Sequence, residues 1–176
     1  MNRKKRLIGG KKPLAFAGIF ALVAIIEYLL LYEFAPDFLV QGFIDMTAKT
    51  LHFILSVTGA AVELAGEVLV FPDKTRLTIV YECTGGFAMF IFSACVIAYP
   101  SSLFSKVLGH LLGLIGIFII NMGRLLVLSW AVLHAPAAFD FIHKYLWQAV
   151  FILLVLALWA FWINLFTGKS PKKKKR

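Results

Sequence analysis

One cysteine of the chain lies in a setting that suits nucleophilic chemistry. Cys83 opens the sequence Cys-Thr-Gly-Gly, just before a long apolar run. A cysteine at a helix N-terminus, near a fixed positive charge, has its thiolate favoured, and the thiolate is the nucleophile. Gly85 and Gly86 would let a substrate backbone approach closely. Residue 83 is therefore a candidate nucleophile, whereas Cys95, deep in the apolar run, is expected to be an inert buried thiol without a disulfide partner.

A charged residue inside another apolar run is the second candidate. Arg124 has long apolar segments on both sides, and Asn121 precedes it by one helical turn on nearly the same face. Ionisable side chains inside membrane segments are costly and usually face a bundle interior or a watery cavity. Arg124 is thus a functional-site hypothesis. The alternative is a structural role, in which Glu27 or Glu33 neutralises Arg124 and locks the helices together.

Thiol chemistry also needs a base, and two histidines are candidates. His134 and His143 flank the connection between the last two apolar runs. An imidazole beside a cysteine can take the thiol proton and return it to a leaving amine, and the sequence alone does not choose between the two. A zinc site from Cys83, His134 and His143 is disfavoured, because neither Cys-x-x-Cys nor His-Glu-x-x-His spacing occurs. No metal and no cofactor are expected.

The amino-acid composition indicates whether these residues lie in a soluble protein or in a membrane protein. The 176 residues are 61% hydrophobic and 15% charged, with a mean hydropathy of +0.87. A soluble domain of this length carries about 25% charged and about 45–50% apolar residues. The excess of apolar side chains lies in long runs, which excludes a soluble domain with a polar surface and indicates a membrane protein.

The apolar runs predict an all-α membrane protein, a four-span transmembrane helix bundle. A hydrocarbon core of about 30 Å requires about 20 residues at about 1.5 Å each. The predicted spans lie at about 14–35, 81–100, 107–133 and 144–166. Between the first two, the outer segment 36–80 reads as an extracytoplasmic amphipathic helix followed by a short β-hairpin around residues 72–75. No repeat divides the chain, so residues 14–166 are expected to form a single transmembrane catalytic domain.

Charge predicts the orientation. The net charge is +9, and the two tails, 1–13 and 167–176, hold twelve of the 18 basic residues, so the body is mildly acidic. Lysine and arginine beside spans stay on the cytoplasmic side. Both tails are therefore expected to be cytoplasmic in a multi-pass protein of the cell (inner or plasma) membrane. Anionic lipids are expected partners of the tails, and nucleic acid is not.

Counting along the second and third spans places the two candidates at one height. Cys83 lies 17 residues before Pro100, and Arg124 lies 18 residues after Lys106. At about 1.5 Å per residue both lie roughly 26 Å above the inner boundary, in the outer leaflet. The apolar stretch 125–133 beyond Arg124 then requires either a tilted helix or a cover from the outer segment.

These motifs together resemble the exosortase/archaeosortase family of integral-membrane cysteine transpeptidases, in a compact form. Glu82-Cys83-Thr84-Gly85-Gly86 resembles the family's Cys-(Ser/Thr)-Gly element, and Asn121-Met122-Gly123-Arg124 its Asn-x-x-Arg element. His143 matches the family's later histidine. The resemblance covers roughly residues 78–166. At 176 residues the chain looks like the catalytic core of the larger members.

The resemblance implies an activity and a set of site residues. Cys83 would attack a peptide bond next to the C-terminal sorting helix of an exported protein and form a thioester, at the outer leaflet. Arg124 would steady the oxyanion or position the substrate, and His143 would shuttle protons. The acyl group would pass to a lipid or glycan acceptor. Residues expected to bind substrate or support the site are Glu82, Thr84, Gly85, Gly86, Asn121, Glu27 and Glu33.

Two other functions fit the same residues. The first is a non-enzymatic small membrane transporter or assembly subunit, in which Arg124 and glutamates of the first span form a structural cluster. The second keeps the thiol chemistry but changes the substrate, giving a lipid-facing acyltransferase or a plain intramembrane protease. The first predicts that Cys83→Ala leaves function intact. The second predicts thioester formation without transfer of a protein chain.

Overall fold

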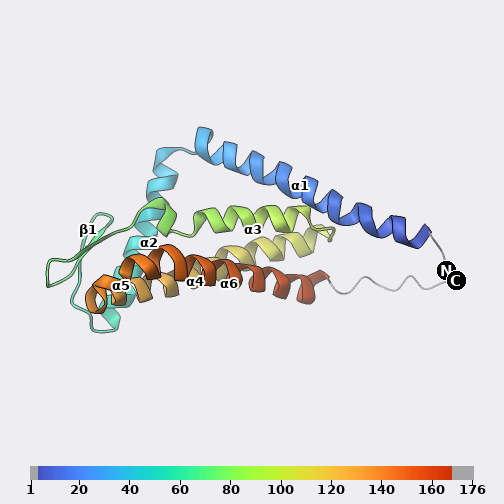
Figure 1. Ribbon diagram of the computed structural model, residues 1–176. Coiled ribbons are helices and arrows are strands. Elements are labelled where there is room, and N and C mark those ends of the chain that lie inside the picture. Colours follow the sequence, from blue (N-terminus) through green and yellow to red (C-terminus); the bar gives the residue numbers. More distant parts are fainter. Residues whose placement is uncertain (1–3, 168–176) are drawn as a thin grey trace.

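The computed structural model describes residues 4–167, and it describes side chains there except at residues 4–12, 31–33, 146–147 and 167. Residues 1–3 and 168–176, which belong to the predicted tails, lie outside the described part. The helices are α1 (Lys4–Phe34), α2 (Asp37–Val57), α3 (Gly86–Ala98), α4 (Leu103–His134), α5 (Pro136–Phe141) and α6 (Trp147–Trp162) (Figure 1). The strands are β1 (Glu63–Ala65), β2 (Val68–Val70) and β3 (Arg76–Thr78). A 3₁₀ turn and two π-helical turns complete the fold, namely η1 (Tyr81–Cys83), η2 (Ile142–Leu146) and η3 (Ile163–Thr167).

Three helical stretches of the described chain are long and apolar enough to cross a membrane. They are Pro13–Leu30 within α1, Leu103–His134, and Pro136–Phe166. These correspond to the first, third and fourth predicted spans. The second predicted span, 81–100, is represented by α3, whose 13 residues measure about 20 Å. Length and composition therefore support three spans and leave α3 as a shorter apolar helix.

Local backbone conformation explains why α3 is short. Gly85 precedes the helix with a φ of 79°, in the left-handed region that ends a helix running in from η1. At the other end Tyr99 is extended, with a ψ of 132°. The residue before a proline is pushed out of the α-helical region, and Pro100 follows Tyr99. Gly85 and Pro100 thus limit the length of α3, whereas hydropathy alone predicted a helix of 20 residues.

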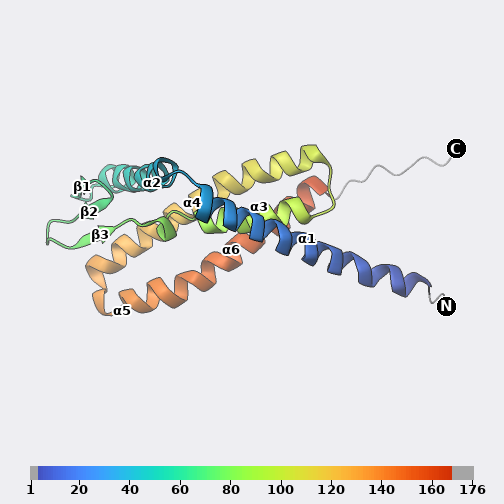
Figure 2. The same cartoon turned by 90° about the horizontal axis from the view of Figure 1, so that it is seen from above.

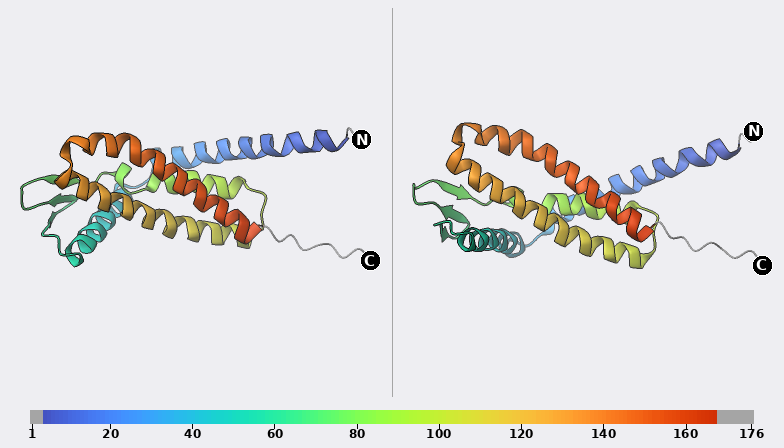
Figure 3. Two further views of the ribbon diagram at one scale, coloured as in Figure 1. Left: turned by 60° about the horizontal axis from the view of Figure 1, so that its bottom comes forward. Right: turned by 90° about the horizontal axis from the view of Figure 1, so that it is seen from below.

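The elements gather at two ends of the molecule. The beginning of α1, the end of η3 and the connection between α3 and α4 lie at one end, while α2, the sheet and α5 lie at the other (Figures 1 and 2). Helices α3, α4 and α6 run side by side between the two ends, and α1 packs against α3 (Figure 3). The candidate residues near the ends of α3, α4 and α6 can therefore meet at the end that carries α2 and the sheet.

The outer segment covers the end of α4. Ile44, Ala48 and Leu51 of α2 form one core with Leu125 and Leu128 of α4. Both α4 leucines are 1% exposed. The apolar stretch beyond Arg124 is thus covered by the outer segment, which is one of the two arrangements that the sequence required. Each leucine buried here from water contributes about 1.5–3 kcal/mol.

The sheet has three strands, where the sequence predicted a two-stranded hairpin. β2 pairs antiparallel with β3, as expected, and β1 adds a strand on its other side, with Ala65 opposite Val68. Gly66 takes a φ of 65° in the two-residue turn between them, as tight hairpins require. Three residues of β1 are too few to show an alternating pattern. In the β2–β3 turn, hydrogen bonds from the backbone and then the side chain of Thr75 hold the pKa of Asp73 below its usual value.

Glycines of α4 allow the helices to approach closely. A Cβ on Gly109 would lie 2.6 Å from Nε1 of Trp162, a fully buried ring whose Nε1 donates a hydrogen bond to the Ser105 carbonyl at 2.9 Å. A Cβ on Gly113 would lie 2.4 Å from the Phe92 ring. Small residues at helix contacts are a main source of packing energy in membranes.

This packing gives a stability prediction with a control on the same helix. Gly109→Ala should lower the stability of the detergent-solubilised protein by about 1–3 kcal/mol, because α6 must move away from α4. Gly123→Ala should leave stability unchanged or raise it slightly, because nothing lies within 4 Å of a Cβ there. Thermal unfolding of both variants measures the difference. Equal effects would contradict the close α4–α6 packing.

Candidate active site

Cys83 ends the turn η1 and is packed inside the protein. Its residue is 9% exposed, and it belongs to the core that α2 and α4 share with the sheet. Its thiol is not in a disulfide. The sulfur therefore does not face lipid, which is the first condition for a reactive role in a membrane protein.

Asn121 joins the Cys83 turn to α4. Its Nδ2 donates a hydrogen bond to the carbonyl oxygen of Cys83 at 2.8 Å, and the Asn121 side chain is fully buried. A buried amide must be hydrogen-bonded, so this bond fixes the height of η1 against α4. Arg124 follows Asn121 by three residues, so its backbone lies about 4.5 Å further along α4 than the residue that binds the Cys83 turn.

The residues after Cys83 shape the turn. Thr84 donates from Oγ1 to the Tyr81 carbonyl at 2.7 Å and accepts from the Gly86 backbone N–H at 3.2 Å. A Cβ on Gly85 would lie 3.2 Å from Asn121, and a Cβ on Gly86 would lie 2.6 Å from the Tyr81 hydroxyl. Both glycines are therefore required by packing within the protein, a reason that differs from the substrate contact expected from the sequence.

Arg124 contacts the last helix. Its guanidinium carbon is 5.8 Å from the centre of the Phe151 ring of α6, a cation–π contact. The Arg124 charge interacts electrostatically with the Cys83 thiol and with the His143 imidazole. Phe151 could not be predicted as a partner, because nothing in an apolar run marks which ring faces a distant helix.

His143 lies in the π-helical turn η2, and π-helical turns are frequent at functional sites. Its ring stacks on Phe139 at 5.6 Å between centroids, with 6° between the planes. Nδ1 is buried and has no hydrogen-bond partner among the residues that the structure describes. A stacked ring with an unpaired nitrogen, within electrostatic range of Arg124, has the chemistry of a base.

His134 has a different setting. Its Nδ1 is 3.0 Å from the Trp130 carbonyl of its own helix, and its ring stacks on exposed Trp130. His134 is itself exposed. His143 therefore lies within electrostatic range of Arg124. His134 lies exposed on α4, so a zinc site that needs both histidines gains no support.

The glutamates do not gather at this site. Glu27 accepts a hydrogen bond from Ser93 at 2.7 Å, and Ser93 lies ten residues, about 15 Å, along the chain from Cys83. Glu82 is exposed beside the thiol. Glu33 belongs to α1, but its side chain lies outside the described part. The expected cluster of Arg124 with Glu27 is replaced by a separate polar cluster, which the sequence did not reveal.

Comparison with protein families decides the identity of this bundle. A family described as transmembrane exosortase matches residues 11–161, which is most of the chain. The chain belongs to the transmembrane exosortase family. No curated protein and no solved structure matches. The match spans α1 to α6, so it includes the Cys83 turn, Asn121, Arg124 and His143 of this exosortase-family protein.

Proposed function

We propose that this exosortase-family protein is a membrane-embedded cysteine peptidase and transpeptidase. It cleaves the C-terminal sorting helix from exported proteins through a thioester on Cys83 and transfers the new C-terminus to a lipid or glycan acceptor. The observation that carries the proposal is that the Arg124 guanidinium of α4 interacts electrostatically both with the buried Cys83 thiol of η1 and with the His143 imidazole of η2, whose buried Nδ1 has no hydrogen-bond partner among the described residues. The thiol provides a nucleophile, the guanidinium a donor to the oxyanion, and the imidazole a base, which are the groups that acyl transfer requires.

In the first step Cys83 is the nucleophile. His143 takes the thiol proton, and the thiolate, stabilised by the Arg124 charge, attacks the carbonyl carbon of the scissile peptide bond. Arg124 donates to the oxyanion that forms. The carbon–nitrogen bond then breaks, and His143 returns its proton to the leaving amine of the sorting helix. The products are a thioester on Cys83 and a free helix.

In the second step the acceptor takes the acyl group. A hydroxyl or amine of a lipid or surface glycan attacks the thioester carbon and gives its proton to His143. The carbon–sulfur bond breaks, and the proton returns to the Cys83 sulfur. The thiol and imidazole are then in their starting states, so no cofactor is consumed.

Topology supports an outward-facing site. The basic tails adjoin the beginning of α1 and the end of η3. Both of these point away from α2, the sheet and α5, toward the opposite end of the molecule (Figure 1). Basic residues beside spans favour the cytoplasm. We therefore place both termini in the cytoplasm, the segment 81–100 as a fourth crossing, and the Cys83 site at the outer leaflet of the cell membrane.

The proposal is tested by co-expressing the protein with exported proteins that end in a transmembrane helix. Wild type should shorten at least one of them by the length of that helix. His143→Ala should lower the rate about 10²- to 10⁴-fold, the usual contribution of a general acid–base. His134→Ala, with an exposed ring, should process at the wild-type rate. Immunoblots of the shortened substrate measure both variants, and equal losses would contradict the assignment of His143.

A further inference from the structure

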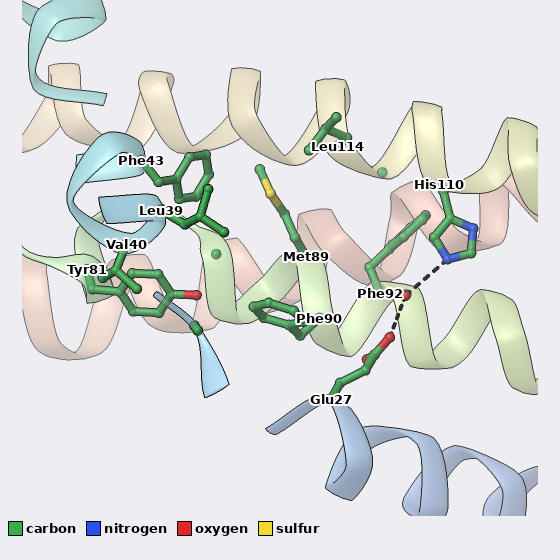
Figure 4. A pocket seen from close by; sticks show the side chains of 14 residues that line it. Glu27, Leu39, Val40, Phe43, Tyr81, Met89, Phe90, Phe92, His110 and Leu114 are labelled. Atoms are coloured by element: carbon green, nitrogen blue, oxygen red, sulfur yellow. Dashed lines mark hydrogen bonds between the residues drawn. The ribbon is translucent and has the colours of Figure 1, made fainter. Parts of the chain in front are cut away.

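A cavity of about 540 Å³ lies between α1, α2, α3 and α4, apart from the Cys83 thiol. Figure 4 shows its apolar wall, which includes Leu39, Met89, Phe90 and Leu114. Leu39 is 56% and Leu114 54% exposed, so the wall continues onto the surface of the bundle. The cavity is therefore open sideways, toward the space that lipid or another helix occupies.

One end of the cavity is polar. Oγ of Ser93 lies 2.7 Å from Glu27 Oε1 and 3.0 Å from Nε2 of His110, and it is hydrogen-bonded to both (Figure 4, dashed lines). Nδ1 of His110 lies 2.8 Å from the Lys106 carbonyl, so it must carry a proton and donate. Three side chains from α1, α3 and α4 are thus joined in one hydrogen-bonded chain inside the membrane.

Two proton arrangements satisfy all of these bonds. Either Glu27 is ionised and His110 is an imidazolium that donates to Ser93, or Glu27 donates from Oε1 to Ser93, which donates to a neutral His110. In both arrangements the second carboxyl oxygen of Glu27, Oε2, is an acceptor. Oε2 is buried and has no hydrogen-bond partner among the described residues. A buried acceptor without a donor is costly, so this atom indicates a ligand that brings a donor.

The depth of the chain identifies the class of ligand. His110 lies seven residues, about 10 Å, above the start of α4, well inside the hydrocarbon region. Lipid headgroups, with their hydroxyls and amines, stay at the interface. A transmembrane helix, by contrast, carries a polar side chain to this depth and satisfies its own backbone. On the α1 side, α1 packs mainly against α3 (Figure 3).

The far end of the cavity lies next to the nucleophile. Tyr81 and Gly86 line it there, and they flank Cys83 in the sequence. From Gly86 to Ser93 is seven residues of α3, or about 10 Å. A helix that begins beside Tyr81 therefore passes Glu27 about two turns below its N-terminal end.

We propose that this cavity seats the substrate's sorting helix, and that Glu27 Oε2 accepts a hydrogen bond from a donor side chain about two turns after the scissile bond. This inference rests on the proposed function and adds the docking face and a specificity-determining residue. Asn or Lys in the sorting helix provides such a donor, and an interhelical hydrogen bond in a membrane favours one register over another.

Photo-crosslinking tests the docking face. A benzophenone amino acid replaces Leu114 at the cavity, or Leu153 on exposed α6 as the control, in a Cys83→Ala background with a processed substrate. We expect the substrate helix to crosslink at residue 114 and not at 153. Crosslinking only at 153, or at 114 only to a second copy of this chain, overturns the docking face while wild-type processing preserves the proposed function. If wild type also fails to process every substrate, the proposed function fails and the docking fails with it.

Glu27→Met tests the hydrogen bond. Ser93 then donates to neutral His110, so the variant leaves no new unsatisfied group. Wild type should process a substrate with Asn two turns after the scissile bond about tenfold faster than one with Leu there, and Glu27→Met should process both at the slower rate. Moving Asn by two positions, to the opposite helix face, should abolish the advantage in wild type. A preference for Asn that persists in Glu27→Met would overturn the role of Glu27.

Discussion

Cys83→Ala is expected to abolish release of the sorting helix, with a loss of about 10⁴-fold or more in processing rate. Without the sulfur no thioester forms, and the remaining residues provide only binding and charge, so little catalysis over background is left. The variant should still insert and fold, because Cys83 is small and the bond from Asn121 goes to its backbone carbonyl, which alanine retains. Immunoblotting of a co-expressed substrate measures the loss.

The second cysteine is the matched control. Cys95 lies further along α3, half-buried, and is also a free thiol. Cys95→Ala should process substrate at the wild-type rate, since Cys95 lies twelve residues, about 18 Å, along the chain from Cys83. Full processing by Cys83→Ala, or an equal loss in the two variants, would favour the non-enzymatic reading of the bundle.

Arg124→Ala should lower processing about 10²- to 10³-fold, the usual effect of removing one donor to an oxyanion. The variant removes the charge that interacts with both Cys83 and His143, and it leaves the Asn121 bond to the Cys83 turn in place. Single-turnover rates with a purified substrate measure the loss. Thermal unfolding in detergent checks that the bundle is retained.

Arg124→Lys separates charge from geometry. Lysine keeps the charge but loses the planar guanidinium with its five donors and most of the contact with Phe151. We expect a rate between those of wild type and Arg124→Ala. If Arg124→Ala processes normally, Arg124 has a packing role only, and the assignment of an oxyanion donor is wrong.

The lengths of the apolar runs and the spacing of the motifs predicted the long helices and the family. The helices that contain the long apolar runs formed where hydropathy indicated, and the family followed from the motifs around Cys83, Arg124 and His143. The residue count predicted Cys83 and Arg124 at one height, and the Asn121 bond places the Cys83 turn within about one helical turn of Arg124.

Other features depend on contacts that spacing does not encode. Glu27, Ser93 and His110 form a hydrogen-bonded chain that joins three helices. Residue counting could not predict the depth of Glu27, because α1 is tilted against the other helices (Figure 1). Glu27 was therefore one of two glutamates considered as the partner of Arg124. The left-handed backbone conformation of Gly85 sets where α3 begins. A hydropathy average over many residues does not detect such a single position. The choice of His143 over His134 required the stacking of each ring.

The most direct measurement of the central claim is to trap the acyl-enzyme on Cys83. The protein is co-expressed with a processed substrate, denatured at acidic pH, and examined by mass spectrometry with and without hydroxylamine. The expected result is a substrate chain joined to the peptide that contains Cys83, ending at the residue before the sorting helix, and released by hydroxylamine. Processed substrate without any such adduct, or an adduct of equal amount in Cys83→Ala, would contradict a thioester mechanism at this site.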